Sequence, residues 1–188
     1  MGRVVVTEFV SLDGVMEDPG GAEGFEHGGW VFEFERGKDG DDFKLNEILD
    51  AKAHLLGRVT YEGFADAWPS RTGEFADRLN NDPKYVVSST LEKPEWTNTT
   101  VLDGDAATEV AKLRDQIDGD ILVAGSRHLV QALLRAKLVD ELRLMVFPIV
   151  LGTGKRLFDE GLDKSAFRLV ESKPVGEDGV VTLVYRPR

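Results

Sequence analysis

Apolar and polar positions along the chain follow two different spacings, which predict strands and helices in alternation. The run Arg3–Val10 is β-branched and almost wholly apolar, as expected of a buried central strand. Over Asp105–Ile117 the apolar residues fall on one helical face, which predicts an amphipathic helix. The same spacings predict further strands at Ala53–Leu56, Lys84–Leu91, Val101–Leu102, Ile121–Ala124 and Leu142–Val150. They predict further helices at Asp41–Lys52, Thr60–Ala67, Glu74–Asn80 and Ser126–Ala136.

The last segment, Phe167–Arg188, predicts a β-hairpin, because Asp178-Gly179 is a favoured turn between two apolar runs. Strands and helices alternate before it, and no internal repeat or linker interrupts them. The pattern therefore predicts an α/β fold with a mixed sheet, in a single domain over residues 1–188.

One segment, Ser11–Gly40, breaks this alternation. It is rich in Gly, Asp and Glu, and aromatic residues are scattered through it. A loop of this length inside a compact domain is usually functional or disordered, and disordered segments tend to lack aromatics. We therefore expect this loop to fold over something.

Charge and composition narrow the classes of partner. The formal net charge is −11, which argues against nucleic acid or an anionic membrane as the main partner. A small anionic ligand remains compatible, because a few local arginines can outweigh a distant field. The chain has no cysteine, which excludes thiolate catalysis and disulfides and suits the cytoplasm, where we expect the protein. No signal peptide is evident, and no apolar run approaches membrane-spanning length.

Two strand-to-helix junctions carry candidate chemistry. In the first, Gly57 and Arg58 follow a strand and Thr60 opens a helix; in the second, Gly125 and Ser126 do the same. Each junction could be an anion site, since free helix N–H groups and a guanidinium favour a phosphate. Each could equally be an ordinary turn in which glycine gives backbone freedom and the hydroxyl caps the helix. The pattern alone leaves both interpretations open.

Other candidates are weaker. The segment Gly152–Phe158 contains Gly-Thr-Gly-Lys but lacks the spacing of a phosphate-binding P-loop, so we interpret it as a tight turn. The three histidines show no metal-ligand spacing, and we expect no metal site. Asp13 is most simply a turn residue, although its place directly after the first strand leaves a catalytic role open. Asp41 belongs to an acidic helix start that complements the helix dipole.

Five segments, in this order, resemble one known family: "HLLGRVTYE", "KYVVSSTL", "ILVAGSRHLVQALL", "LVDELRLMVFPIVLGTGKRLF" and "GVVTLVY". They are similar to the dihydrofolate-reductase-like family, in the branch that resembles the C-terminal reductase domain of the bifunctional riboflavin-biosynthesis deaminase-reductase. The likeness runs from about Val4 to Tyr185. It implies a mostly parallel central sheet flanked by helices, a C-terminal hairpin, and NADPH bound across the strand ends.

The resemblance also implies which residues hold the cofactor. The family's Gly-Arg-x-Thr turn matches Gly57, Arg58 and Thr60, and it places Arg58 against the 2′-phosphate. Ser88 and Ser89 match the serines near the adenosine. The resemblance thus favours the phosphate-site interpretation of the first junction.

The second junction matches the family's glycine-rich turn around the pyrophosphate and nicotinamide. The matching residues here are Gly125, Ser126, Arg127 and Leu129. The chemistry implied is hydride transfer from NADPH to a C=N or C=O bond of a small polar heterocycle, which would be pterin-, folate- or pyrimidine-like.

The resemblance says less about the proton donor and about the oligomeric state. Asp13 fits the riboflavin-type pattern, and Asp41 lies sixteen residues before Gly57, where folate reductases carry an acid. The family implies a homodimer, with Ser11–Gly40 as a loop that excludes water from the nicotinamide. The alternative function is NADPH binding without turnover, in a sensor or sequestering role.

Overall fold

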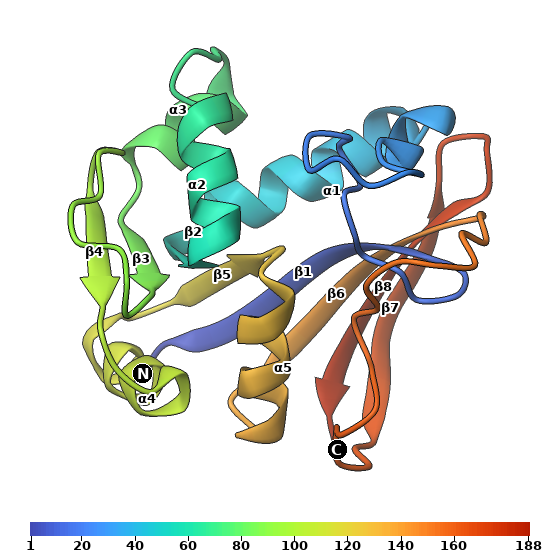
Figure 1. The fold of residues 1–188 in the computed structure, drawn as a ribbon. Coiled ribbons are helices and arrows are strands. Elements are labelled where there is room, and N and C mark those ends of the chain that lie inside the picture. The colour runs from blue at the N-terminus through green and yellow to red at the C-terminus, as the bar shows by residue number, and fades with distance from the viewer.

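The computed structural model describes residues 1–188 and contains one eight-stranded sheet (Figure 1). The order of strands across the sheet is β4-β3-β2-β5-β1-β6-β8-β7. The strands are β1 (Arg3–Ser11), β2 (Ala51–Gly57), β3 (Lys84–Val87), β4 (Thr99–Leu102), β5 (Asp120–Ala124), β6 (Glu141–Phe147), β7 (Phe167–Val175) and β8 (Val180–Pro187). The helices are the short 3-10 helix η1 (Trp30–Glu33), α1 (Gly37–Asp50), α2 (Arg58–Ala67), α3 (Glu74–Asn81), α4 (Ala106–Gln116) and α5 (Arg127–Arg135).

The sheet is mostly parallel, as predicted. β1 pairs in parallel with β5 on one side and β6 on the other, and β2, β3 and β4 continue the parallel order. Only β8 runs against its neighbours, pairing antiparallel with both β6 and β7. The α/β, dihydrofolate-reductase-like fold with a C-terminal hairpin is therefore confirmed.

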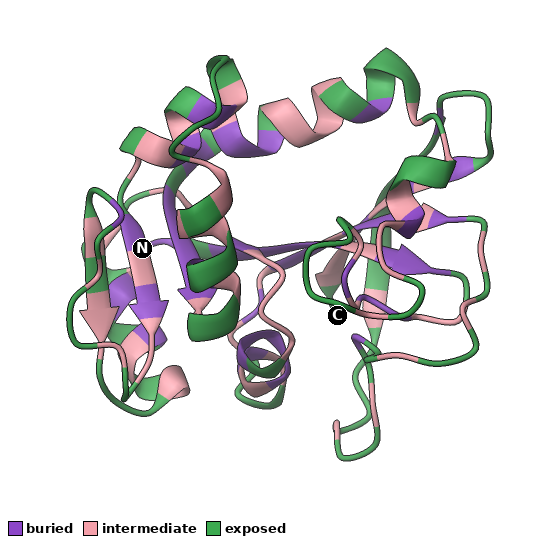
Figure 2. Ribbon diagram, turned by 45° about the horizontal axis from the view of Figure 1, so that its top comes forward, coloured by how far each residue is buried: buried purple, intermediate pink, exposed green.

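Helices cover both faces of the sheet, so the central strands are apolar on both sides. α4 and α5 pack on one face through Leu113, Val130 and Leu133, against Val4 and Val6 of β1. On the other face, α1, α2 and α3 pack on the sheet through residues of a second cluster. Figure 2 shows the buried residues concentrated in the central strands.

Several element boundaries differ from the sequence prediction by a few residues, and two of these differences have a clear physical cause. α1 begins at Gly37 rather than at Asp41, because its first turn is polar and hydrophobic spacing cannot detect it. β3 ends at Val87 rather than at Leu91. There the hydroxyl of Ser88 accepts hydrogen bonds from the backbone N–H groups of Thr90 and Leu91, which turns the chain out of the sheet.

The long Ser11–Gly40 segment is a folded loop that its own side chains hold. The carboxylate of Asp18 accepts hydrogen bonds from the backbone N–H groups of Ala22, Glu23 and Phe25. Trp30 is fully buried, and its indole N–H donates to the carbonyl of Glu17 at 2.9 Å. Trp30 thus anchors this loop, as an aromatic residue in a polar segment predicts.

None of the helices has the length and apolar character needed to cross a membrane.

Candidate functional site

The two junctions lie next to each other at the carboxyl ends of β2 and β5, which are neighbours in the sheet. On its other side, β5 pairs with β1, and these two strands separate after the pair Thr7–Ala124. From there the chain leaves β1 towards α1 on one face and leaves β5 towards α5 on the other. In open α/β sheets, ligands bind at this kind of topological switch point.

The two junctions exchange their caps. The hydroxyl of Ser126 accepts a hydrogen bond from the Gly57 N–H at 2.8 Å. In return, the hydroxyl of Thr60 accepts from the Ser126 N–H at 2.9 Å. Neither hydroxyl caps its own helix, so the interpretation of Thr60 and Ser126 as ordinary caps was wrong. The exchange makes α2 and α5 begin side by side, with their amino ends at one place.

Gly125 and Gly57 serve different purposes in this arrangement. Gly125 has φ +60°, and a Cβ there would lie 3.1 Å from Oγ1 and 3.2 Å from Cγ2 of Thr60. Gly57 has φ −79°, which any residue can adopt. The expectation that this turn needs glycine for backbone freedom is therefore wrong for Gly57. A Cβ on Gly57 would instead meet that of Ser126 at 3.4 Å. Gly125 therefore permits the close approach of the two junctions, whereas a Cβ on Gly57 would make only an ordinary van der Waals contact.

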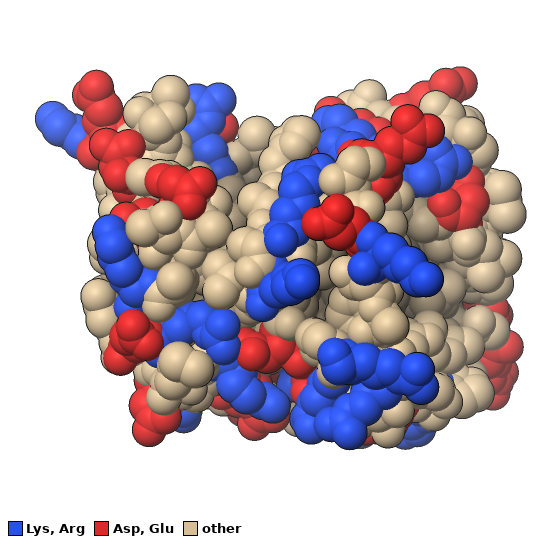
Figure 3. Space-filling model, turned by 90° about the horizontal axis from the view of Figure 1, so that it is seen from below, with Lys and Arg blue, Asp and Glu red and all other residues tan.

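Arg58 extends from the start of α2 to the loop after β3. Its side chain is 47% exposed, and it donates to the hydroxyl of Thr90 at 3.2 Å. The hydroxyls of Thr90 and Ser88 lie 3.4 Å apart, and Ser89 beside them is exposed. A half-exposed guanidinium next to a helix amino end and several hydroxyls suits a phosphate. Figure 3 shows Lys and Arg side chains gathered beside a hollow in one face, so local positive charge persists despite the net charge.

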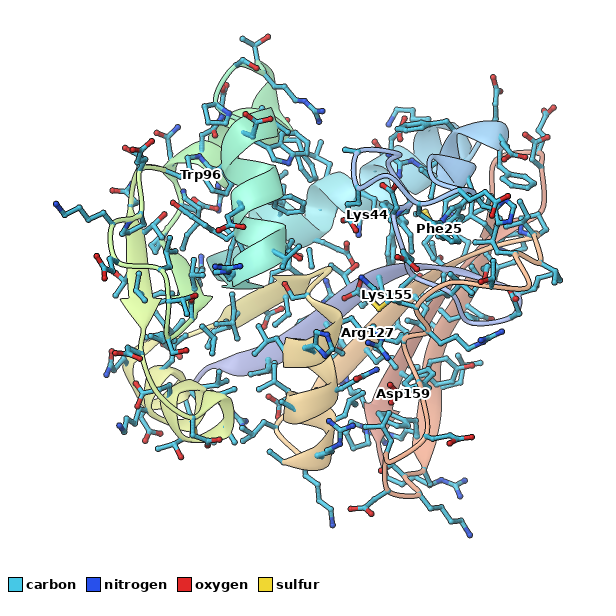
Figure 4. The ribbon with its side chains drawn as sticks, viewed as in Figure 1. Phe25, Lys44, Trp96, Arg127, Lys155 and Asp159 are labelled. Atoms are coloured by element: carbon cyan, nitrogen blue, oxygen red, sulfur yellow. The ribbon has the colours of Figure 1, made fainter.

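Arg127 and Leu129 have structural contacts. The guanidinium of Arg127 donates to the carbonyl of Arg156 at 2.9 Å and to the carboxylate of Asp159 at 2.5 Å (Figure 4). These bonds hold the segment after β6 against α5. Leu129 is buried in the main core cluster. The cofactor roles of both residues stay predictions.

Asp13 is an acceptor that holds two loops together. Its carboxylate accepts from the hydroxyl of Ser11 at 2.6 Å and from the N–H groups of Leu151 and Gly152 at 3.1 and 2.8 Å. Burial alone would raise the pKa of Asp13, but these hydrogen bonds outweigh it and lower the pKa to about 2. Asp13 is therefore ionised at neutral pH, which does not suit a proton donor.

Asp41 lies away from the two junctions. Its side chain is 66% exposed and pairs with Arg36 at 2.8 Å near the start of α1. The catalytic roles of Asp13 and Asp41 stay predictions, and these contacts give both residues a structural role.

Replacing Asp13 with asparagine is expected to lower the free energy of unfolding by about 1–2 kcal/mol at neutral pH, after allowance for solvent screening. Because the folded-state pKa is depressed, this stabilisation is present above the unfolded-state pKa near 3.8 and is lost as the pH falls towards 2. Urea unfolding of both proteins across this range measures it. Asp41→Asn is the matched control, and a pH-independent difference for Asp13→Asn contradicts the prediction.

Sequence reasoning missed Glu8, which lies where β1 and β5 separate. Glu8 is 5% exposed, and its Oε2 accepts from the Gly125 N–H at 3.2 Å, whereas its Oε1 has no hydrogen-bond partner. Burial raises the pKa of Glu8 well above its usual value; Lys44 and the Gly125 amide oppose this, and Glu47 adds to it. The available signal was the pair Thr7-Glu8 inside an otherwise apolar strand.

Comparison with known proteins agrees with this geometry. The family model described as "RibD C-terminal domain" matches residues 3–181. The uncharacterized proteins YwjB and YyaP of Bacillus subtilis (strain 168) are each 27% identical to the chain. The YwjB match covers 93% of both chains, and the YyaP match covers 97% of this chain and 94% of the other.

Two solved structures share the fold. A putative riboflavin biosynthesis protein from Shewanella sp. PV-4 superposes with a TM-score of 0.77 at 22% identity, covering 99% of each chain. Dihydrofolate reductase from Enterococcus faecalis, complexed with NADP(H), superposes with a TM-score of 0.64 at 19% identity, covering 99% of this chain and 96% of that one. Because the family model spans nearly the whole sequence, the chain belongs to the RibD C-terminal domain family.

Proposed function

We propose that the protein is an NADPH-dependent reductase that reduces a C=N or C=O bond of a small polar heterocycle. The observation that carries the proposal is the exchange of caps between Gly57, Thr60 and Ser126, which sets two helix amino ends side by side. The half-exposed Arg58 lies at one of them. Membership of a reductase family and the fold shared with an NADP(H)-complexed reductase support the same conclusion.

On this proposal, each part of the site has a separate task. Arg58 pairs with the 2′-phosphate, and Ser88 and Ser89 lie near the adenosine. The junction at Gly125 and Ser126 holds the pyrophosphate, with Arg127 and Leu129 behind it. When bound, the nicotinamide supplies the hydride, and the Ser11–Gly40 loop keeps water away from it.

A proton donor must be able to hold a proton at the pH of the reaction. Asp13 is ionised, and Asp41 is exposed beside Arg36. Glu8 is buried at the switch point and keeps its proton to higher pH than an ordinary glutamate. On our proposal, Glu8 is the better candidate for this role.

Removal of the Arg58 guanidinium tests the phosphate site. We expect the wild type to bind NADPH more tightly than NADH, and Arg58→Ala to weaken NADPH binding about 10–100-fold, since a charge-assisted contact of about 1.5–3 kcal/mol is lost. Binding of NADH should change little, because NADH lacks the 2′-phosphate. The titration can follow the fluorescence of Trp30, Trp68 and Trp96.

The control for this titration is Arg168→Ala, an exposed arginine on β7. Equal loss in both variants, or no binding of either nucleotide by the wild type, overturns the reductase proposal. Binding of NADPH without its oxidation by any carbonyl or imine compound favours the alternative, a binding protein without turnover.

Two further expectations belong to the same proposal. We propose a homodimer, because β7 is an edge strand with Leu169 and Val170 exposed on it. The cytoplasmic location expected from the lack of cysteine stays a prediction.

A further inference from the structure

The side chain of Glu8 places a carboxylate at the amino end of α5. Its Oε2 accepts the Gly125 N–H at 3.2 Å, two residues before Arg127, where α5 begins. Helix amino ends present free N–H donors to anions, so this N–H is one of the groups that a phosphate at the second junction would use. Gly125 itself is partly exposed, which leaves the junction open to a ligand. The chain therefore supplies an anion of its own at this junction.

The Glu8 carboxylate is held there by few contacts. The side chain is buried, its Oε1 has no hydrogen-bond partner, and the bond from Gly125 to Oε2 is longer than a usual charge-assisted bond. An ionised carboxylate that is buried without several donors is costly, because it has given up its hydration. The folded protein therefore holds this anion weakly.

The charged groups of α1 do not neutralise Glu8. Burial raises the pKa of Glu8; Lys44 and the Gly125 amide oppose the rise, and Glu47 adds to it. Lys44 lies under α1, towards the sheet (Figure 4), but its ammonium pairs with Oε2 of Glu47 at 2.6 Å. The attraction of Lys44 for Glu8 is therefore shared with a second carboxylate.

The other elements around Glu8 offer no counter-charge either. Leu144, its partner on β6, is apolar, and α5 packs on β1 through apolar residues. The first residue of α5, Arg127, donates to Asp159 and to the carbonyl of Arg156. Its guanidinium is therefore engaged on the far side of the helix start from Glu8.

A pyrophosphate at Gly125 would bring two further negative charges next to this carboxylate. Anions that share one partly buried site disfavour each other's ionisation, and the weaker acid takes up a proton. An esterified pyrophosphate stays ionised at neutral pH, so the weaker acid is Glu8. A neutral carboxylic acid also no longer competes with the phosphate for the Gly125 N–H.

We propose that Glu8 stands in for the pyrophosphate on the Gly125 N–H in the free protein, and that NADPH binding displaces it while Glu8 takes up a proton from solvent. The hydrogen bond from Gly125 to Oε2 breaks, and an O–H bond forms on the carboxyl group. This inference rests on the proposed function, because it places NADPH at the second junction. Cofactor and proton then arrive together, and the reduction of a C=N or C=O bond consumes one hydride and one proton.

Calorimetry of NADPH binding in HEPES and in Tris, two buffers with different ionisation enthalpies, measures the protons taken up. For the wild type, we expect the uptake to rise towards about one proton per NADPH between about pH 6 and pH 9. The affinity should fall by up to about tenfold per pH unit, the factor that one linked proton gives. Glu8→Gln keeps an oxygen that accepts the Gly125 N–H but cannot titrate. It should lack this uptake and bind NADPH more tightly than the wild type at about pH 9.

Two controls isolate Glu8. The 2′-phosphate of NADPH titrates near about pH 6, so the uptake is taken as the difference between wild type and Glu8→Gln. NADH has the same pyrophosphate without the 2′-phosphate, and the wild type should take up a proton with NADH as well. Glu177→Gln, an exposed glutamate in the turn between β7 and β8, should behave as the wild type does. Urea unfolding confirms that each variant is folded.

The outcomes separate the two proposals. Equal uptake in wild type and Glu8→Gln, or no uptake with NADH, overturns the role of Glu8, and NADPH oxidation by a carbonyl or imine compound would then still retain the reductase. Uptake that depends on Glu8, without oxidation by any such compound, retains the role of Glu8 and removes the reductase. A wild type that binds no nucleotide overturns both.

Discussion

Replacing Gly125 with valine is expected to abolish measurable NADPH binding and to lower the free energy of unfolding by about 3 kcal/mol. Two effects add. The backbone at Gly125 has φ +60°, a conformation that a β-branched residue adopts only with strain. A Cβ would also press on Oγ1 and Cγ2 of Thr60, whose hydroxyl accepts the Ser126 N–H. Valine therefore forces apart the two junctions that we propose to hold the phosphates.

The measurement is NADPH titration together with urea unfolding, and the chain offers a matched control. Gly63 lies in the middle of α2, and no atom outside its own helix lies within 4 Å of a Cβ there. Gly63→Ala should therefore stabilise the protein by about 1 kcal/mol, through helix propensity alone, and leave binding unchanged.

Gly125→Ala provides a graded test, since it adds the Cβ without branching and should show a smaller loss of both properties. Wild-type affinity in Gly125→Val would contradict the proposal that the two junctions act as one nucleotide site. Loss of stability with intact affinity would mean that Gly125 matters for packing alone.

The sequence predicts the sheet and the positions of both junctions, because these depend on local patterns. The apolar run at Arg3–Val10 becomes β1, and glycine follows β2 and β5 where expected. Contacts between distant segments could not be predicted in this way. Ser126 accepts from Gly57, 69 residues earlier, and a local pattern suggests only that each hydroxyl caps its own helix.

In the candidate site, too, local patterns were predictable and contacts between distant segments were not. The family resemblance points to Arg58, whose neighbour Thr90 comes from a loop 32 residues further on. The signal at Glu8, an acidic residue in an otherwise apolar strand, did not by itself identify a site, because a polar residue in a strand gains meaning only from what packs against it. Asp13 was noticed for its position after β1, but its partners Leu151 and Gly152 come from the other end of the chain.

Lys84 is the clearest case of a residue whose role the sequence conceals, since a lysine at the start of a strand is normally exposed. Here it is fully buried. Its ammonium donates to the carbonyls of Leu79, Asn80 and Asp82 at 2.9–3.0 Å and lies 4.5 Å from the ring centre of Trp96. The lysine thus satisfies carbonyls that the end of α3 leaves without a partner.

Lys84→Met is therefore expected to lower the free energy of unfolding by about 3 kcal/mol, because methionine fills the space but leaves three buried carbonyls unpaired. Thermal or urea unfolding measures the loss, and Lys93→Met, an exposed lysine in the loop before Trp96, is the control. A difference below about 0.5 kcal/mol, as for a surface substitution, would contradict the structural role of Lys84.

The pH dependence of the free energy of unfolding is a second, independent test of Lys84. Burial lowers the pKa of Lys84 to about 8, against 10.5 for an ordinary lysine, while Asp82 opposes the shift. Between these values the unfolded chain binds more protons at this position than the folded protein does, so this group makes stability rise with pH over that interval. Lys84→Met removes the group, and the rise should be present in the wild type and absent from the variant. The stability difference between the two proteins should therefore widen from pH 8 towards 10.5, and a constant difference would mean that Lys84 titrates as an exposed lysine does.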